Sequence, residues 1–235
     1  METNFQLKEL TDLLSGKSIE DQLLMFTELY PGKVIFTTSL GIEDQVITHM
    51  IFTNNINVKV VTLDTGRLFR DTYDVLSSTV IKYRKNINVY FPGHEDVEKM
   101  VTEKGPYSFY RSIEDRKECC NIRKVLPLNR ALKGMEVWIS GIRASQSNDR
   151  SQLKSIEYDA DKNLIKYYPL FDWSLEDVEK FLKGNNVPYN SLHDKGYVSI
   201  GCEPCTRPVK KGEDFRAGRW WWENDGPKEC GCHTK

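Results

Sequence analysis

The distribution of cysteines is the feature that most constrains how this chain can fold. Its 235 residues include six cysteines in three groups: Cys119 with Cys120, Cys202 with Cys205, and Cys230 with Cys232. Two intervening residues let both thiolates of a Cys-X-X-Cys pair face one point, so four sulfurs from two short segments can form a tetrahedral metal shell. The fold must then bring the segment near residue 120 to the segment near residue 203.

The adjacent cysteines favour one kind of metal site over another. Cys119 and Cys120 need an unusual local backbone to share a centre, which suits a compact iron–sulfur cluster better than a zinc ribbon. Zinc in the same shell remains the alternative. In a reducing cytosol such a cysteine set is typical of metal binding or catalysis rather than of a disulfide framework.

Composition limits the classes of partner. The formal net charge is -1, which gives no general attraction to nucleic acid or to anionic lipid. The N-terminus lacks a basic start followed by an apolar run, and no apolar stretch reaches about 18 residues. We therefore expect a cytoplasmic protein that binds neither membrane nor nucleic acid.

Hydrophobic periodicity alternates between strand and helix along the chain. Amphipathic helices are expected over 5–14 and 19–30, and strand-like segments at 33–39, 58–64, 86–91, 136–141 and 164–170. Helices are expected between them, over 42–52, 68–84, 94–105 and 118–132, with a further one after Ser174 as N-cap. This order predicts an α/β fold with a doubly wound, mainly parallel sheet. We expect a main domain over 1–200 and an irregular C-terminal segment over 201–235.

Three loops follow strands and should meet at one edge of the sheet. They read TTSLGIED, LDTGR and SGIRASQSNDR, and each joins a strand to a helix or a polar loop. Their hydroxyls, exposed backbone and arginines suit a nucleotide that carries an acidic group. The candidate binding residues are Thr38, Ser39, Gly41, Thr65, Gly66, Arg67, Gly141, Arg143, Ser147 and Arg150.

From residue 35 to the end, the chain resembles a known family. Its segments TSLGIEDQV, LDTGRLF, ECCNIRKVLPL, SGIRASQSNDRS, YYPLFDWS, PYNSLHDKGYVSIGCEPCTRPV, GRWWW and KECGCH are similar to those of assimilatory adenylyl-sulfate reductases of the iron–sulfur type. The resemblance implies a fold of the adenine nucleotide α-hydrolase-like type and a [4Fe-4S] cluster. It also implies reduction of adenosine 5'-phosphosulfate to sulfite and AMP.

The resemblance also implies roles for individual residues. It makes Cys119, Cys120, Cys202 and Cys205 the cluster ligands and Cys230 the nucleophile. Lys124 would lie between cluster and substrate and stabilise the sulfate group, and His233 is close enough in sequence to Cys230 to assist it. Leu63, Thr65 and Gly141, with the loop around Thr38 and Ser39, would hold the adenosine, and the anion contacts would be Arg143, Arg150, Arg216 and Arg219.

The expected chemistry is thiol-dependent. Lys124 and the arginines would lower the pKa of Cys230, whose thiolate would attack the sulfate sulfur, expel AMP and become a thiosulfonate. Thioredoxin or glutaredoxin would then reduce that intermediate and release sulfite.

Several alternatives remain at this stage. The loop TTSLG leaves open 3'-phosphoadenosine 5'-phosphosulfate as substrate, alone or beside its unphosphorylated form. An ATP-using nucleotide α-hydrolase is disfavoured because SLGIED lacks the second glycine and serine of a pyrophosphate loop. A non-catalytic redox or nucleotide sensor would need the four-cysteine site without Cys230 and Lys124. Cys232 is read as an incidental thiol or a resolving one, and a homo-oligomer is left open.

Overall fold

The molecule is built on one six-stranded sheet, with strand order β3-β2-β1-β4-β6-β5. The computed structural model describes residues 2–146, 150 and 152–223. Strand β1 pairs in parallel with β4, β4 pairs in parallel with β6, and β5 runs antiparallel at the edge next to β6. The predicted α/β class with a mainly parallel sheet is confirmed.

The elements follow the expected alternation. The strands are β1 Val34–Thr38, β2 Lys59–Leu63, β3 Asn88–Tyr90, β4 Val137–Ile139, β5 Ile156–Asp159 and β6 Leu164–Tyr167. The α-helices are α1 Glu2–Leu14, α2 Ile19–Leu29, α3 Ile42–Thr53, α4 Arg70–Tyr83, α5 His94–Lys104, α6 Ile113–Cys120, α7 Leu126–Leu132 and α9 Leu175–Gly184. Short turns of 3-10 helix lie at Ser108–Tyr110, Ala144–Gln146, Ser191–Lys195 and Glu203–Cys205, and a π-helical turn spans Asn121–Val125.

The chain divides into two compact units. Unit 1 comprises Met1–Val61, Val75–Asn88 and Gly134–Tyr189, and unit 2 comprises Thr62–Asp74, Val89–Lys133 and Asn190–Lys235. Both units are discontinuous in sequence, because the chain passes between them several times. From the sequence we divide the chain at residue 200, because we expect the C-terminal segment to have a separate role. That division stays a prediction.

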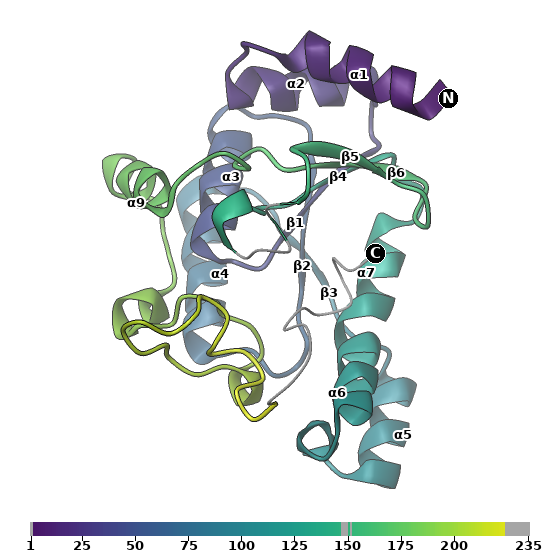
Figure 1. The fold of residues 1–235 in the computed structure, drawn as a ribbon, viewed down its shortest axis with the longest axis vertical. Helices are drawn as coiled ribbons and strands as arrows, with labels where there is room; N and C mark the ends of the chain where they lie inside the picture. The colour runs from purple at the N-terminus through teal and green to yellow at the C-terminus, as the bar shows by residue number, and fades with distance from the viewer. Residues whose placement is uncertain (1, 147–149, 151, 224–235) are drawn as a thin grey trace. The chain divides into compact units, whose positions relative to one another are not determined.

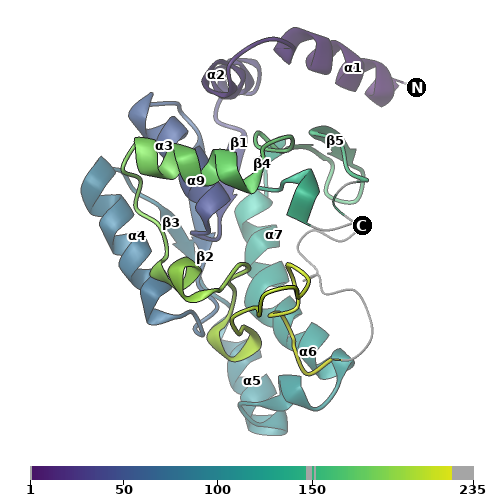
Figure 2. The same ribbon diagram turned by 60° about the vertical axis from the view of Figure 1, so that its left-hand side comes forward.

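In unit 1 the core forms around α3 and the central strands. Figure 1 shows α3 beside β1, and Figure 2 shows α9 across α3. The α3 helix is buried almost all round, so its polar Gln45 needs internal partners: its amide donates to Thr79 Oγ1 at 2.8 Å and to the Pro188 carbonyl at 2.7 Å. Helix α9 starts at the predicted N-cap, where Ser174 and Asp177 form a capping box.

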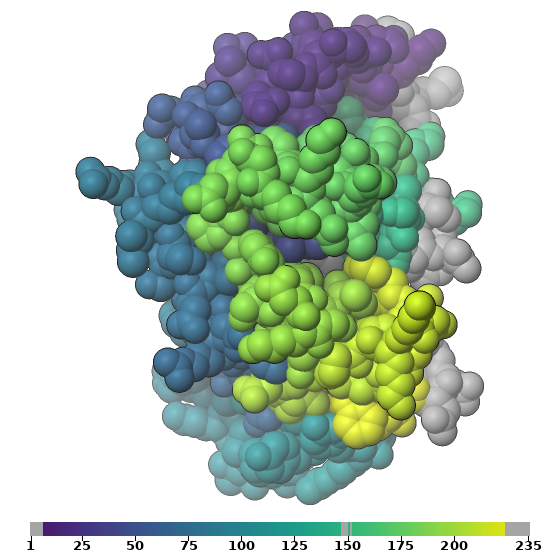
Figure 3. Space-filling view, turned by 90° about the vertical axis from the view of Figure 1, so that its left-hand side faces the viewer, coloured from purple at the N-terminus to yellow at the C-terminus, as the bar shows by residue number. Residues whose placement is uncertain are grey.

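In unit 2 the core contains thiols as well as apolar side chains. Cys119, Cys202 and Cys205 are buried together with Phe109 and Trp220. Figure 3 shows the C-terminal described segment, coloured lime to yellow, as one continuous region of the surface. The two cysteine segments that the sequence required to meet are therefore both in this unit.

The helix that carries the paired cysteines differs from its predicted form. It starts five residues earlier than expected, at Ile113, because Ser112 caps it by accepting a hydrogen bond from Asp115 N–H. It then widens into a π-helical turn before Pro127, where Leu126 N–H bonds to the Asn121 carbonyl. Proline lacks an N–H and its ring crowds the preceding turn, so a widened turn accommodates it. This turn carries Lys124.

Strand β5 was not predicted. Its residues IEYD alternate poorly and follow a polar loop, yet they pair with β6 through a short hairpin in which Asn163 adopts a positive φ of 53°. An edge strand needs only one neighbour and one buried face, so its sequence signal is weak.

Replacement of Gly141 by alanine should destabilise unit 1. A Cβ atom there would lie 2.3 Å from Asp44 Oδ1 and 3.2 Å from Asp44 N, and the buried Asp44 carboxylate is held by hydrogen bonds from Ser39 and Gly141. We expect the free energy of unfolding in urea to fall by about 1–3 kcal/mol. Gly184→Ala is the control: no atom lies within 4 Å of its Cβ position in α9, so stability should hold or rise. Equal stability of Gly141→Ala and the wild type would contradict this packing.

Candidate functional site

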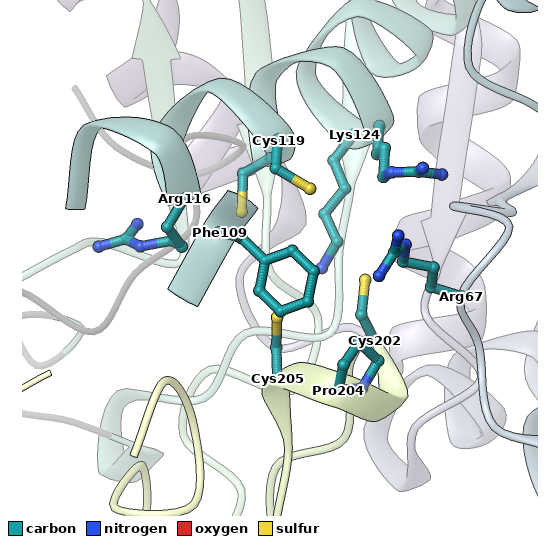
Figure 4. Close-up of a pocket in the computed structure, with 10 residues that line it drawn as sticks. Arg67, Phe109, Arg116, Cys119, Lys124, Cys202, Pro204 and Cys205 are labelled. Atoms are coloured by element: carbon teal, nitrogen blue, oxygen red, sulfur yellow. The ribbon is translucent and has the colours of Figure 1, made fainter. Parts of the chain in front are cut away.

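A small pocket in unit 2 collects all four cysteines proposed as metal ligands. Its lining is Arg67, Phe109, Arg116, Cys119, Cys120, Arg123, Lys124, Cys202, Pro204 and Cys205. In Figure 4 the sulfurs of Cys119 and Cys202 point into the space between the helix and the turn below it, and Lys124 extends into the same space. The juxtaposition that the sequence required is thus present, and Lys124 lies with it.

Local structure explains how the two cysteine segments are held. Cys119 and Cys120 end α6, and Cys202 precedes the 3-10 turn that contains Pro204 and Cys205. That turn is fixed to the LDTGR loop, since Glu203 N–H donates to the Arg67 carbonyl at 2.8 Å. It is also fixed to the tryptophan segment, since Trp220 N–H donates to the Cys205 carbonyl at 3.2 Å.

Burial and charge compete at the thiols. Burial raises the pKa of Cys119, against the lowering effect of Arg123 and Arg67, and burial with the neighbouring Cys202 raises the pKa of Cys205 to about 12. The described cysteines are not disulfide-bonded. Without a cation at their centre such thiols stay protonated, whereas a bound metal deprotonates them outright.

The residues present fit an iron–sulfur cluster. Four soft thiol ligands share one pocket with Arg67, Arg123 and Lys124, whose positive charges can balance the negative charge of thiolates. Among the described residues, the buried Arg123 Nε and Trp220 Nε1 have no hydrogen-bond acceptor, and sulfur atoms of a cluster can accept from such groups. Within the same residues, no three His, Cys, Asp or Glu side chains are grouped closely enough to hold a single metal ion.

Sequence reasoning missed two arginines of this pocket. Arg123 is 6% exposed, and its Nη1 donates to the Thr65 carbonyl at 2.7 Å. Arg116 is 3% exposed and forms two hydrogen bonds with Glu223. The available signal was helical spacing: Arg123 follows Cys119 by one turn and Arg116 precedes it by nearly one turn.

In unit 1 the predicted nucleotide loop is organised by a carboxylate. Asp44 Oδ2 accepts from Ser39 N–H and Ser39 Oγ, both at 2.6 Å, and Asp44 Oδ1 accepts from Gly141 N–H at 3.1 Å. Thr38 Oγ1 accepts from Leu40 N–H at 2.9 Å, and Gly41 is the N-cap of α3. Thr38, Ser39, Gly41 and Gly141 are therefore brought together, around a residue that sequence reasoning did not select.

The predicted anion contacts of unit 1 already have partners in the fold. Arg143 is 2% exposed, and its guanidinium pairs with the Glu43 carboxylate at 3.0 Å and donates to Ser145 Oγ at 2.6 Å. Gln146 donates to the same Glu43 oxygen at 2.9 Å and accepts from Arg150. These contacts fix the start of the loop that follows β4.

The remaining predicted residues lie in unit 2 or outside the described chain. Leu63 ends β2, and buried Thr65 accepts a hydrogen bond from the Cys202 thiol at 3.3 Å. Gly66 has a positive φ of 69°, and Arg67 lies over the Phe109 ring at 5.1 Å. Arg216 and Arg219 are 8% and 5% exposed, and Arg219 stacks on Trp220 at 4.9 Å. Ser147, Cys230, Cys232 and His233 lie outside the described residues.

Comparison with known proteins identifies the family. The model of the phosphoadenosine phosphosulfate reductase domain matches residues 33–208, so the chain belongs to this family.

None of the described helices has the length and apolar character needed to cross a bilayer.

Individual relatives are similar over most of the chain. The adenosine 5'-phosphosulfate reductase of Agrobacterium fabrum is 47% identical over 90% of this chain and 81% of its own, and that of Neisseria meningitidis serogroup B is 50% identical over 84% and 81%. The crystal structure of phosphoadenylyl-sulfate reductase from Candida auris, a phosphate complex, aligns with a TM-score of 0.72 and 30% identity, covering 86% of this chain and 96% of that one. Candida glabrata FMN adenylyltransferase shares the fold alone, at a TM-score of 0.54 and 15% identity, over 87% of this chain and 72% of its own.

Titration of Asp44 should make the stability of the protein depend on pH. Burial raises the pKa of Asp44 to about 6 in spite of its hydrogen bonds, whereas an unfolded aspartate titrates near 4. The folded state therefore holds the proton more tightly, and this contribution to stability is full below about pH 4 and is lost as pH rises through about 6. The loss is of the order of 2–3 kcal/mol.

The measurement is urea unfolding of the wild type and of Asp44→Asn at pH 4, 5, 6 and 7. The wild type should lose stability relative to the variant as pH rises. Asp177→Asn is a control of opposite sign, because hydrogen bonds from Ser174 lower the pKa of Asp177. A constant difference between wild type and Asp44→Asn over this range would rule out the assignment.

Proposed function

We propose that this chain is an oxidoreductase that reduces adenosine 5'-phosphosulfate to sulfite and AMP in sulfate assimilation. The observation that carries the proposal is the pocket that holds Lys124 with Cys119, Cys120, Cys202 and Cys205. Membership of the phosphoadenosine phosphosulfate reductase domain family supports it, as do the relatives named adenosine 5'-phosphosulfate reductase. A non-catalytic sensor would have no use for this lysine together with a C-terminal Cys230.

In the first step Cys230 acts as nucleophile. Its thiolate attacks the sulfur of the sulfate group, an S–S bond forms, and the bond from that sulfur to the bridging oxygen breaks. AMP leaves with the electron pair of the broken bond, and a sulfonate remains on Cys230. The ammonium of Lys124 stabilises the negative charge of the sulfate as the bond breaks. His233, three positions after Cys230, assists its deprotonation.

In the second step a dithiol protein reductant, thioredoxin or glutaredoxin, supplies two electrons. Its thiolate attacks the Cys230 sulfur, and sulfite leaves with the pair of electrons from the S–S bond. The second thiol of the reductant then displaces Cys230 and leaves a disulfide in the reductant. We place this reaction in the cytoplasm, where such reductants are kept reduced.

The four cysteines of the pocket would hold a [4Fe-4S] cluster through their thiolates. The cluster would tie the two cysteine segments together, and it would supply a fixed charge distribution beside Lys124. The reducing equivalents come from thiols, so Arg67, Arg123 and Lys124 act by balancing charge and by orienting the pocket.

The remaining predicted residues bind the nucleotide in this proposal. Thr38, Ser39, Gly41 and Gly141 present backbone and hydroxyl groups, and Asp44 holds Ser39 and Gly141. Leu63, Thr65 and Gly66 present the end of the LDTG segment. The anion contacts are Arg150, Arg216 and Arg219. Arg143 contributes through the loop that it fixes by pairing with Glu43.

The first test is intact-protein mass after anaerobic incubation with adenosine 5'-phosphosulfate and no reductant. We expect one added sulfonate, mapped to Cys230, because no thiol is present to release it as sulfite. Cys230→Ser should bind the nucleotide and gain no mass. A parallel incubation uses the 3'-phosphorylated nucleotide. The nucleotide that forms the adduct faster is the preferred substrate. No adduct from either nucleotide on cluster-replete protein would favour the sensor.

The cluster is tested by iron and acid-labile sulfide in anaerobically purified protein. We expect about four of each per chain, and Cys202→Ser should lose most of both because one iron loses its ligand. Cys232→Ser, which removes a thiol outside the proposed ligand set, is the matched control and should retain them. If the protein contains one zinc per chain and no labile sulfide, the zinc site is correct and the cluster proposal is wrong.

A further inference from the structure

Arg219 is a buried cation whose counter-charge does not lie in the described chain. The residue is 5% exposed, and its Nε has no hydrogen-bond acceptor among the described residues. Arg116 and Arg143 are also buried, but each pairs with a carboxylate, whereas no described carboxylate pairs with Arg219. A guanidinium buried without a counter-charge is costly, so this position suits an arginine that binds an anionic ligand.

Backbone contacts fix the segment that carries Arg219. Thr206 and Arg219 form an antiparallel bridge, and Arg207 N–H donates to the Gly218 carbonyl at 3.0 Å. The Thr206 hydroxyl also accepts a hydrogen bond from Gly201 N–H, at 3.3 Å. Gly201 and the backbone of Arg219 are therefore held side by side, and the arginine side chain is the part that can yield.

Gly201 lies against the end of the Arg219 side chain. A Cβ atom at Gly201 would lie 2.3 Å from Arg219 Nη2, 2.4 Å from Nη1 and 2.5 Å from Cζ. Atoms in favourable contact lie about 3.5–4.0 Å apart, so an alanine here would displace the guanidinium by about 1 Å. The φ angle of Gly201 lies outside the left-handed region, so the backbone itself does not require glycine. It is the guanidinium that needs the space.

Gly218, in the same segment, excludes a side chain for a different reason. A Cβ atom there would lie 2.3 Å from the carbonyl oxygen of Arg207 and 3.2 Å from Val209 Cγ2. The Arg207 oxygen belongs to the backbone that pairs with Gly218, so an alanine at 218 would disrupt the packing of this segment. At Gly201 the obstacle is the end of a flexible side chain, which moves at a lower cost.

We propose that Gly201 positions the Arg219 guanidinium for binding an anionic group of the nucleotide. The proposal rests on the proposed function, in which Arg219 is an anion contact. A guanidinium binds phosphate or sulfate oxygens best through two parallel N–H groups, so its orientation matters as much as its distance. Gly201 and the Trp220 ring, whose centre is 4.9 Å from Arg219 Cζ, restrict that orientation. Gly201 is a positioning residue, because it acts through Arg219.

The experiment is equilibrium binding of ADP to anaerobically purified wild type, Gly201→Ala, Arg219→Ala and the double variant. ADP carries adenosine and two anionic phosphates, and it has no sulfate sulfur for a thiol to attack. Gly201→Ala should bind ADP about ten- to a hundredfold more weakly, which is the usual effect of losing a hydrogen bond to a charged group. In the double variant no guanidinium remains to be displaced, so its affinity should equal that of Arg219→Ala.

Two control variants separate positioning from folding. Gly184→Ala, for which no described atom lies within 4 Å of the added Cβ, should bind ADP as the wild type does. Gly218→Ala should unfold at a lower urea concentration than the wild type, whereas Gly201→Ala should stay near the wild-type midpoint and keep its iron. If Gly201→Ala does not fold, the double variant decides: a folded double variant supports the contact, and an unfolded one overturns it.

The outcomes separate this inference from the proposed function. A wild type that forms no sulfonate from adenosine 5'-phosphosulfate overturns the proposed function, whatever its ADP affinity. Wild-type ADP affinity of Arg219→Ala, or of Gly201→Ala while Arg219→Ala binds weakly, overturns the inference alone. An equal loss from Gly201→Ala with and without the Arg219 guanidinium also overturns it, because Gly201 would then act by another route. Loss of iron from Gly201→Ala would overturn it for the same reason.

Discussion

Thiolates crowded into one pocket repel one another and resist burial, so positive charge must surround them. In unit 2, cationic side chains line the pocket that contains the four cysteines. Arg123 and Lys124 lie on the same continuous helical stretch as Cys119 and Cys120, and Arg67 comes from the loop bonded to the Glu203 turn. The π-helical turn between the paired cysteines and Pro127 contains Arg123 and Lys124. Because this turn is wider than an α-helical one, it changes the direction in which these two side chains leave the helix.

In unit 1 a buried negative charge, that of Asp44, organises the predicted nucleotide loop. A loop between a strand and a helix has backbone N–H groups to satisfy, and Asp44 accepts from two of them and from one hydroxyl. Full burial makes its ionised form costly, which is why its pKa rises although three donors surround it. Gly141 has to be glycine for the same reason, since the carboxylate occupies the space of a side chain.

The sequence predicted those features that depend on local pattern. The alternation of strands and helices, the Ser174 N-cap and the meeting of the two cysteine segments follow from periodicity and spacing. It did not predict β5, whose pairing depends on a neighbouring strand, or the early helix start at Ile113. Nor did it select Asp44, because an acidic residue in the first turn of a helix is common and only its burial shows what it binds.

The roles of the arginines could not be predicted from the sequence. The effect of an arginine's charge at a site depends on whether a carboxylate pairs with it, and only the structure shows that partner. Arg116 and Arg143 face the carboxylates of Glu223 and Glu43, so their charges are largely cancelled where they lie, and they act by fixing a segment in place. Arg67 and Arg123 donate to the backbone carbonyls of Pro106 and Thr65, which carry no net charge. Their positive charge is retained beside the thiols. Two arginines that look alike in sequence therefore do different work: Arg67 and Arg123 keep their charge beside the thiols, whereas Arg116 and Arg143 fix the segments that contain Glu223 and Glu43.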